Sequence, residues 1–224
     1  MFSLLLQQYS QAEAQVTVNQ GVVLRAYDSS NNMLAESDFD TPISLTATVT
    51  AGDALTQFQV DGQNVAYFAI EYLASNPEVE APVELVIELD NSSASYTGLF
   101  EEFLEYRIYF GTNKDTAPAI GIYEDAGNPI VVGYTKIDEH GNTIYNVLCS
   151  GSSPSFTCDL DSDNGTTNDQ FTVEVDTINL KIKLYGNLFT LPNLHKSVNF
   201  ILEPVVNPAT QPGTYTVNLY VNPR

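Results

Sequence analysis

The sequence predicts an all-β protein that folds as a jelly-roll-like sandwich of about a dozen strands. Helical signals are almost absent, and short runs that alternate apolar and polar side chains recur between turn residues. A chain of 224 residues, 43% of them hydrophobic, is long enough to bury one large core, so global disorder is excluded. No linker rich in Pro, Gly or Ser divides the sandwich, and no internal repeat is visible.

The predicted strands follow one another at near-regular spacing. The alternation is clearest at residues 43–49, where every second side chain is apolar. Asp61-Gly62 predicts a tight hairpin turn, and residues 139–142 predict another. The best helical signal, one or two turns, lies at residues 99–104. In chain order the expected strands are 15–19, 22–27, 43–49, 58–60, 65–72, 83–89, 106–110, 129–134, the two arms of a hairpin over 136–145, 171–175, 178–184, 198–202 and 215–221.

The charge balance is the most unusual property of the chain. There are 8 Lys and Arg against 28 Asp and Glu, a net charge of −20, and residues 26–106 hold fifteen acids and no Lys or Arg. Such a surface repels phosphate backbones and anionic lipids, which argues against nucleic-acid and membrane partners. It also repels copies of itself, so self-association requires divalent cations, salt or low pH. An acidic coat that only confers solubility is the alternative.

Several features predict a secreted, extracellular protein. Cys149 and Cys158 flank a flexible Gly-, Ser- and Pro-containing loop, and only His140 and His195 are available to complete a zinc site. A local disulfide in an oxidising compartment fits better. The glycosylation sequons at Asn91 and Asn164 also fit export. We expect no membrane insertion in the mature chain, and interpret the short apolar opening MFSLLL as the tail of a processed leader or the start of the mature chain.

The sequence predicts that the protein is not an enzyme. His140 and His195 lie in a turn and a loop, and neither neighbours a nucleophile motif. The chain has no G-x-S-x-G, no H-E-x-x-H and no phosphate-binding glycine loop. Paired carboxylates are frequent, but a chain this acidic contains such pairs by chance.

Residues 159–169 predict a calcium site. Asp159, Asp161, Asp163 and Asp169 place carboxylate oxygens, which calcium prefers, around a turn that contains Gly165. The spacing is not that of an EF-hand, and no Glu closes the loop. The alternative is a polar connector that carries a glycan.

Residues 1–27 predict a donor strand that leaves its own fold and fills a groove in a neighbouring copy, with residues 28–224 forming the sandwich. The apolar face of this segment consists of Val16 and Val18 and, after a shift at Gly21, Val22 and Leu24. Adding a strand to another copy supplies main-chain hydrogen bonds, and repeated head-to-tail contacts build an open fibre. The alternative is the first strand of the chain's own sandwich.

The opening Met1-Phe-Ser, the alternating residues 15–19, Gly21 before a second apolar run, and the closing strand 212–221 resemble TasA/camelysin-like proteins, especially archaeal subunits of bundling pili and cannulae. The resemblance covers about thirty residues at the start and ten at the end, and Leu4 stands where the family pattern has aspartate. It implies a secreted jelly-roll subunit that polymerises with copies of itself, with calcium at some interfaces. The alternatives are a calcium-dependent carbohydrate-binding sandwich, in which Tyr side chains stack on sugars, and a jelly-roll capsid or surface-layer protein.

Overall fold

The computed structural model describes residues 22–37, 41–50, 57–73, 81–90, 104–160, 169–191, 197–206 and 212–224. These residues form eighteen strands and no α-helix, which confirms the all-β prediction. The predicted helical turn falls mostly outside the described residues, except that Leu104 begins a strand. Within the described ranges there is no helix long and apolar enough to cross a bilayer.

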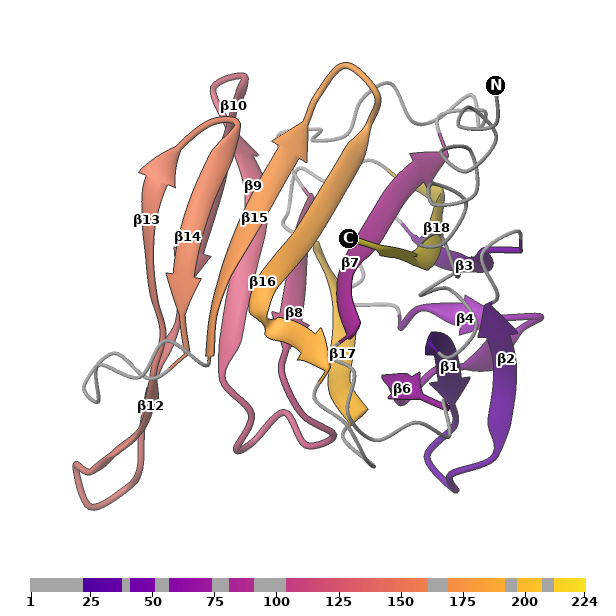
Figure 1. The fold of residues 1–224 in the computed structure, drawn as a ribbon, viewed down its shortest axis with the longest axis horizontal. Coiled ribbons are helices and arrows are strands. Elements are labelled where there is room, and N and C mark those ends of the chain that lie inside the picture. The colour runs from indigo at the N-terminus through magenta and orange to yellow at the C-terminus, as the bar shows by residue number, and fades with distance from the viewer. Residues whose placement is uncertain are drawn as a thin grey trace, which may run out of the picture.

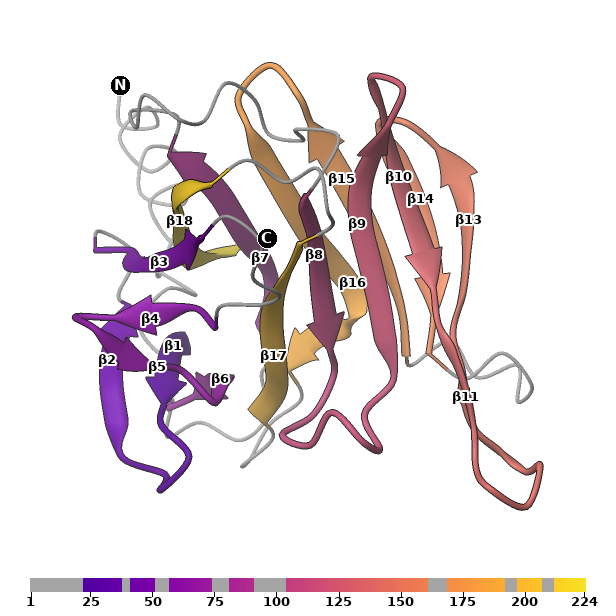
Figure 2. The ribbon, with the colours of Figure 1, turned by 180° about the vertical axis from the view of Figure 1, so that it is seen from behind.

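The strands form two large antiparallel sheets that face each other (Figures 1 and 2). In spatial order the smaller sheet contains β10 (Asn128–Gly133), β9 (Ala119–Asp125), β8 (Leu104–Tyr109), β17 (Ser197–Val206), β6 (Tyr67–Tyr72), β1 (Val22–Tyr27) and β2 (Met33–Ser37). The larger sheet contains β13 (Leu148–Ser152), β14 (Ser155–Asp159), β15 (Gln170–Asp176), β16 (Lys181–Leu191), β7 (Ala81–Asp90), β18 (Gly213–Pro223), β3 (Ile43–Val49), β4 (Gln59–Val60) and β5 (Gln63–Asn64). A separate two-stranded ribbon contains β11 (Thr135–Ile137) and β12 (Thr143–Asn146).

The central eight strands have the connectivity of a jelly roll. Along the chain they are β3, β6, β7, β8, β9, β16, β17 and β18, and every connection except β8 to β9 crosses between the sheets. The late strand β18 lies between β3 and β7, and the late strand β17 lies between β6 and β8. This insertion of the last two strands between the early ones is the double Greek key of a jelly roll.

The remaining strands extend the two sheets. Strands β1 and β2 widen the smaller sheet beyond β6, and the β4–β5 hairpin extends the larger sheet beyond β3. The segment from β10 to β15 is inserted between β9 and β16, and the β11–β12 ribbon within it projects past the ends of both sheets (Figures 1 and 2).

Alternation along the strands fills the space between the sheets. In β3 the side chains of Ile43, Leu45, Ala47 and Val49 are at most 6% exposed, while the residues between them face outward. The same pattern in β15 and β18 buries one face of each strand. Burying a Val, Leu, Ile or Phe side chain stabilises the fold by about 1.5–3 kcal/mol each, before conformational entropy is counted. The sandwich therefore has one continuous apolar core.

The structure corrects two of the expected elements. Residues 149–158 form the β13–β14 hairpin rather than a flexible loop. The strand expected from residue 178 begins at Lys181, because Asp176 accepts hydrogen bonds from the backbone N–H groups of Ile178 and Asn179 and closes a tight turn there. Such local bonds from an Asp side chain compete with the strand ladder.

Candidate functional site

The part of the predicted donor segment that the structure describes belongs to the chain's own sheet. Val22 pairs with Tyr72 and Leu24 with Ile70 in β6, and β2 flanks β1 on the other side. Val22 and Leu24 are 4% and 0% exposed. The boundary at residue 27 is therefore corrected: residues 22–27 are part of the sandwich, because their backbone and apolar face are already paired. Val16 and Val18 lie outside the described residues, and a donor role for them stays a prediction.

Cys149 and Cys158 form a disulfide, which confirms that prediction. They face each other across β13 and β14, with Cα atoms 4.1 Å apart. Cys158 is fully buried, so the bond ties the outermost strand of the larger sheet to the core. In the described ranges no cysteine is free.

The predicted calcium loop is described only at its ends. The side chain of Asp159 accepts a hydrogen bond from Gln170 Nε2 (3.1 Å), and Asp169 lies just before β15. Asp161 and Asp163 lie outside the described residues, as do both sequon residues, Asn91 and Asn164. Among the residues that are described, no cluster of three or more His, Cys, Asp or Glu side chains is arranged to hold a metal. Calcium at residues 159–169 stays a prediction.

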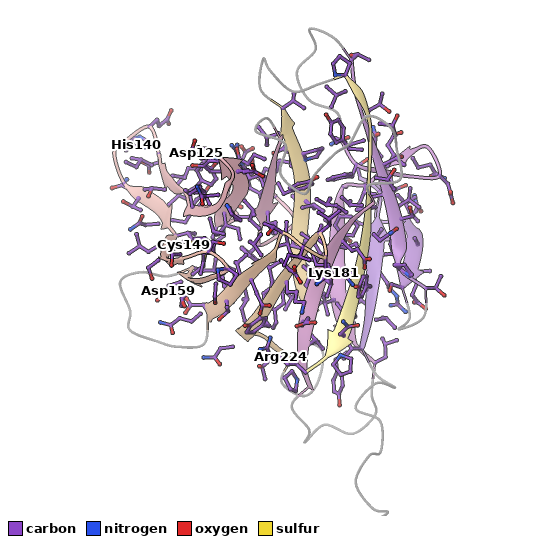
Figure 3. All side chains as sticks on the ribbon, turned by 90° about the horizontal axis from the view of Figure 1, so that it is seen from above. Asp125, His140, Cys149, Asp159, Lys181 and Arg224 are labelled. Carbon is purple, nitrogen blue, oxygen red and sulfur yellow. A yellow bond between two sulfur atoms is a disulfide. The ribbon has the colours of Figure 1, made fainter. Side chains whose placement is uncertain are left out.

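His140 lies in the exposed turn of the β11–β12 ribbon, as expected, and its side chain is 74% exposed. Figure 3 shows His140, Cys149 and Asp159 toward one end of the molecule and Lys181 and Arg224 nearer its middle. His195 lies outside the described residues. Among the predicted site residues that the structure describes, His140, Cys149 and Asp159 therefore lie apart from the polar surface around Lys181 and Arg224.

The ribbon and the neighbouring strand β13 expose apolar side chains. Ile137, Ile144 and Leu148 are 58%, 43% and 56% exposed, and we call these three residues the apolar strip. Ile137 pairs with Thr143, and the register shifts beside this pair so that Ile144 is the extra residue of the ribbon. Leu148 begins β13, four residues further along the chain. Strand β13 is also an edge of the larger sheet, so in the described structure no strand is hydrogen-bonded to its outer side, although β10 of the other sheet contacts it.

A grid of mostly polar side chains covers the outer face of the larger sheet. The alternate residues of these strands, such as Leu85 and Leu184, are fully buried on the inner face. Three rows run across β15, β16, β7 and β18 in register: Asp176, Lys181, Glu88 and Asn218; Glu174, Lys183, Val86 and Tyr220; Thr172, Tyr185, Glu84 and Asn222.

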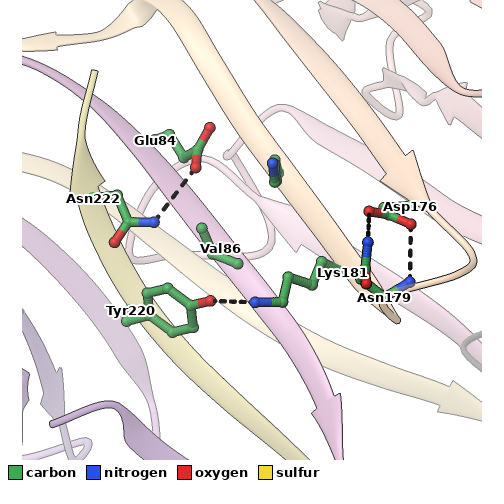
Figure 4. A pocket seen from close by; sticks show the side chains of 8 residues that line it. Glu84, Val86, Asp176, Asn179, Lys181, Tyr220 and Asn222 are labelled. Atoms are coloured by element: carbon green, nitrogen blue, oxygen red, sulfur yellow. Dashed lines mark hydrogen bonds between the residues drawn. The ribbon is translucent and has the colours of Figure 1, made fainter. Parts of the chain in front are cut away.

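A pocket of about 270 Å³ opens in this grid (Figure 4). Val86 occupies the middle of the central row and is shorter than its neighbours in register, Lys183 and Tyr220, so the longer side chains rise around it. Val86 is only 1% exposed although it points to the outer face. The accessible surface of the pocket is therefore mainly polar, with Val86 covered beneath it. Its lining residues are Glu84, Val86, Asp176, Asn179, Lys181, Lys183, Tyr220 and Asn222.

One wall of the pocket is held by a hydrogen-bonded trio. Lys181 Nζ donates to Tyr220 Oη (3.1 Å) and lies 3.1 Å from Glu88 Oε2, and Tyr220 Oη donates to the same carboxylate oxygen (2.8 Å). The hydrogen bond to Tyr220 and the contact with Glu88 raise the pKa of Lys181. Burial, followed by the contact with Glu88, raises the pKa of the Tyr220 phenol. Both groups are therefore protonated at neutral pH.

The opposite wall is built around Glu84. Its carboxylate accepts a hydrogen bond from Asn222 Nδ2 (3.4 Å) and lies 3.5 Å from Arg224 Nη1. The guanidinium carbon of Arg224 in turn lies 3.1 Å from the centroid of the Tyr185 ring. This stacking fixes the guanidinium beside Glu84.

A second polar cluster, on the outer face of the smaller sheet, is filled rather than hollow. Arg107 donates two hydrogen bonds to Glu105 (3.0 Å each), and Tyr134 Oη donates a third (2.5 Å). Burial, with the bond to Glu105, raises the pKa of Tyr134 to about 12. A Cβ atom on Gly121 would lie 2.3 Å from Glu105 Oε1, so the cluster occupies the space above that glycine. The cluster is a structural contact rather than a binding site.

No sequence motif marks the residues of the pocket, but the alternation of polar and apolar residues gives a weak signal for them. Alternation in K-I-K-L-Y and in N-L-Y-V-N predicts that Lys181, Lys183 and Tyr185, and separately Tyr220 and Asn222, share the outward faces of their strands. What the sequence does not show is that β7 lies between these strands.

Comparison of the chain with models of protein families, with curated proteins and with solved structures finds no match.

Proposed function

We propose that this protein is an extracellular structural subunit that assembles with copies of itself. The observation that carries the proposal is the apolar strip beside the open edge of β13. Ile137, Ile144 and Leu148 make up half of the large apolar side chains that are exposed in the described structure; the others are Met33, Leu73 and Ile178. Exposed apolar side chains on a projecting ribbon and on the strand that follows it favour an interaction surface.

The occupant that fits this surface best is a strand of another copy. A strand that adds to the edge of β13 would satisfy its backbone groups and cover Leu148 at the same time. The alternating segment with Val16 and Val18 in residues 11–21 has the pattern required of such a strand. The resemblance to TasA/camelysin-like filament subunits supports the same assignment, with a filament as the product. Copies at net charge −20 repel one another, so assembly requires salt, acid or a divalent cation such as calcium.

The experiment is sedimentation velocity with negative-stain microscopy, with and without calcium. Replacing Ile137, Ile144 and Leu148 by Ser should leave a folded monomer under conditions in which the unmodified chain forms filaments. Ile178→Ser is the matched control, because Ile178 is 89% exposed but lies in the β15–β16 turn, away from the strip. Assembly of the triple variant to the same extent as the control would overturn the role of the strip.

A truncation that begins at Val22 tests the donor segment separately. It keeps β1, which belongs to the sandwich, and removes Val16 and Val18. We expect it to stay folded and monomeric, and a peptide of residues 11–21 should bind to it. Filaments formed by the truncated chain would exclude a donor role for residues 1–21, while leaving the apolar strip as an assembly contact.

A further inference from the structure

We infer that the pocket on the outer face of the larger sheet binds a neutral saccharide. The inference is independent of self-assembly, because the pocket is lined by β7, β16, β18 and the β15–β16 turn, whereas the apolar strip lies on β11, β12 and β13. The pocket combines hydrogen-bond acceptors and hydrogen-bond donors within one hollow of about 270 Å³.

Lys183 distinguishes this pocket, because in the described structure it is a lysine without an ion pair. Among the residues that the structure describes, every other Lys and Arg lies within 4.0 Å of a carboxylate: Arg25, Arg107, Lys114, Lys136, Lys181 and Arg224. Glu174 stands opposite Lys183 in register, but its carboxylate accepts a hydrogen bond from Tyr185 Oη (3.3 Å) and forms no ion pair with Lys183. Lys183, a partly buried residue whose ammonium group has three donors, thus lines the pocket without an ion pair to any described residue, and its charge acts on the neighbouring carboxylate of Asp176.

The other walls supply the complementary groups. Asp176 already accepts hydrogen bonds from Ile178 and Asn179, and Glu84 accepts one from Asn222, but each carboxylate has further lone pairs that can accept from hydroxyl groups. The amide of Asn222 can both donate and accept. Val86 lies beneath the pocket and is only 1% exposed, so the surface that a ligand meets is mainly polar. A ligand that uses these walls must carry many hydroxyls, which both donate and accept hydrogen bonds. A sugar has this feature.

Electrostatics decide between a neutral and an acidic sugar. Near the pocket the charges of Lys181, Lys183 and Arg224 are opposed by those of Glu84, Glu88, Glu174 and Asp176. Lys183 alone would attract a carboxylate, but the surrounding acids and the net charge of −20 repel it. The pocket therefore favours a sugar without charge, to which Lys183 donates a charge-assisted hydrogen bond.

The test is calorimetric titration of the full chain with neutral gluco-, manno- and galacto-oligosaccharides, and with trigalacturonic acid as the charged comparison. We expect at least one neutral probe to bind at millimolar concentration or below, and Lys183→Met, which keeps the aliphatic stem, to weaken that binding by about tenfold or more. Lys136→Met is the matched control, because Lys136 lies on the ribbon, and it should leave the affinity unchanged.

Three outcomes would overturn the inference. Failure of every neutral probe to bind removes the ligand class. Binding that Lys183→Met leaves unchanged removes the pocket as its location, and a second variant, Asn222→Ala, checks that conclusion from the opposite wall. Tighter binding of trigalacturonic acid than of any neutral probe would show that Lys183 outweighs the surrounding acids. Thermal unfolding of each variant confirms that it is folded.

Discussion

Glycine is required at two positions for different physical reasons. A Cβ atom on Gly133 would lie 2.0 Å from the backbone oxygen of Val147, where β10 passes into the ribbon beside the start of β13. Gly62 has open space around it but a φ of +77°, in the tight turn between β4 and β5. Close approach constrains Gly133, and backbone conformation constrains Gly62.

Substitution at these glycines should separate the two causes. Gly133→Ala should lower the free energy of unfolding by about 1–3 kcal/mol, since the neighbouring backbone must shift. Gly62→Ala should lower it by about 1–2 kcal/mol through the left-handed conformation alone. Asn tolerates that conformation, so Gly62→Asn should recover most of the loss whereas Gly133→Asn should not. Urea denaturation measures all four variants, and recovery by Asn at residue 133 would contradict the steric explanation.

Three aspartates close turns in the same way. Asp28 accepts hydrogen bonds from the backbone N–H groups of Ser30 and Asn32 and from the Asn32 side chain, and Asp138 does the same with His140 and Asn142. Asp176 closes the turn before β16 by accepting hydrogen bonds from the backbone N–H groups of Ile178 and Asn179 and from the Asn179 side chain. In each case the side-chain hydrogen bond from the Asn, followed by the backbone bonds, lowers the pKa of the aspartate below its ordinary value of 3.8.

These turns should contribute to the acid sensitivity of the fold. A carboxylate whose pKa is lower in the folded state stabilises that state above its unfolded pKa, and the stabilisation is lost as the pH falls through the folded value. The melting temperature should therefore be insensitive to these groups near pH 7 and should fall below pH of about 4. In a variant with Asp28→Asn, Asp138→Asn and Asp176→Asn, the melting temperature should fall less steeply with decreasing pH than it does in the unmodified chain. Parallel declines of the two melting curves would contradict this.

At the scale of elements, the β13–β14 hairpin depends on its disulfide more than an interior hairpin would. Strand β13 has a partner on one side only and exposes most of its side chains, so little apolar burial holds it. Closing a loop of this length by a disulfide stabilises a fold by about 2–3 kcal/mol in the loop-entropy description. Replacing Cys149 and Cys158 by Ala should lower the free energy of unfolding by about that amount.

The control for this prediction is chemical reduction of the unmodified chain, which breaks the bond without removing the buried sulfur of Cys158. Reduction should lower the free energy of unfolding by most of the amount seen when both cysteines are replaced by Ala. Intact-mass measurement after alkylation without reductant should show no modified cysteine. Two alkylated thiols, or unchanged stability after reduction, would show that the hairpin does not depend on the bond.

The sequence predicts the strands well where the signal is local and poorly where it is not. Alternation places β3, β7, β15 and β18 within a few residues of their true bounds, because the side chains that face the core recur every second position. The β13–β14 hairpin is not predicted because Gly and Ser are frequent in it and few apolar side chains alternate along it. Only the disulfide between Cys149 and Cys158 indicates that its two strands pair. The pocket was missed because Glu84, Lys183 and Tyr220 meet only after β16, β7 and β18 align, and that register depends on the whole jelly roll.

At the scale of the whole molecule, two electrostatic effects oppose each other. The ion pairs of the described residues hold their charged atoms within 4.0 Å, as Arg25 and Glu36 do at 2.7 Å. Exposed pairs of this kind contribute about 0–1 kcal/mol each. The other acids repel one another over longer distances across the surface, and the net charge of −20 measures that imbalance. Self-repulsion of this kind destabilises a compact state.

Salt should therefore stabilise the monomer. Raising the ionic strength from about 0.01 M to about 0.15 M shortens the Debye length from about 30 Å to about 8 Å. The change screens repulsion between distant acids but scarcely affects pairs in contact, so the melting temperature should rise by a few degrees. Replacing the exposed acids Asp125 and Glu139 by Asn and Gln should raise the melting temperature at low salt and reduce its response to salt. Calorimetry at both ionic strengths measures this, and a melting temperature that falls with salt would show that the ion pairs outweigh the repulsion.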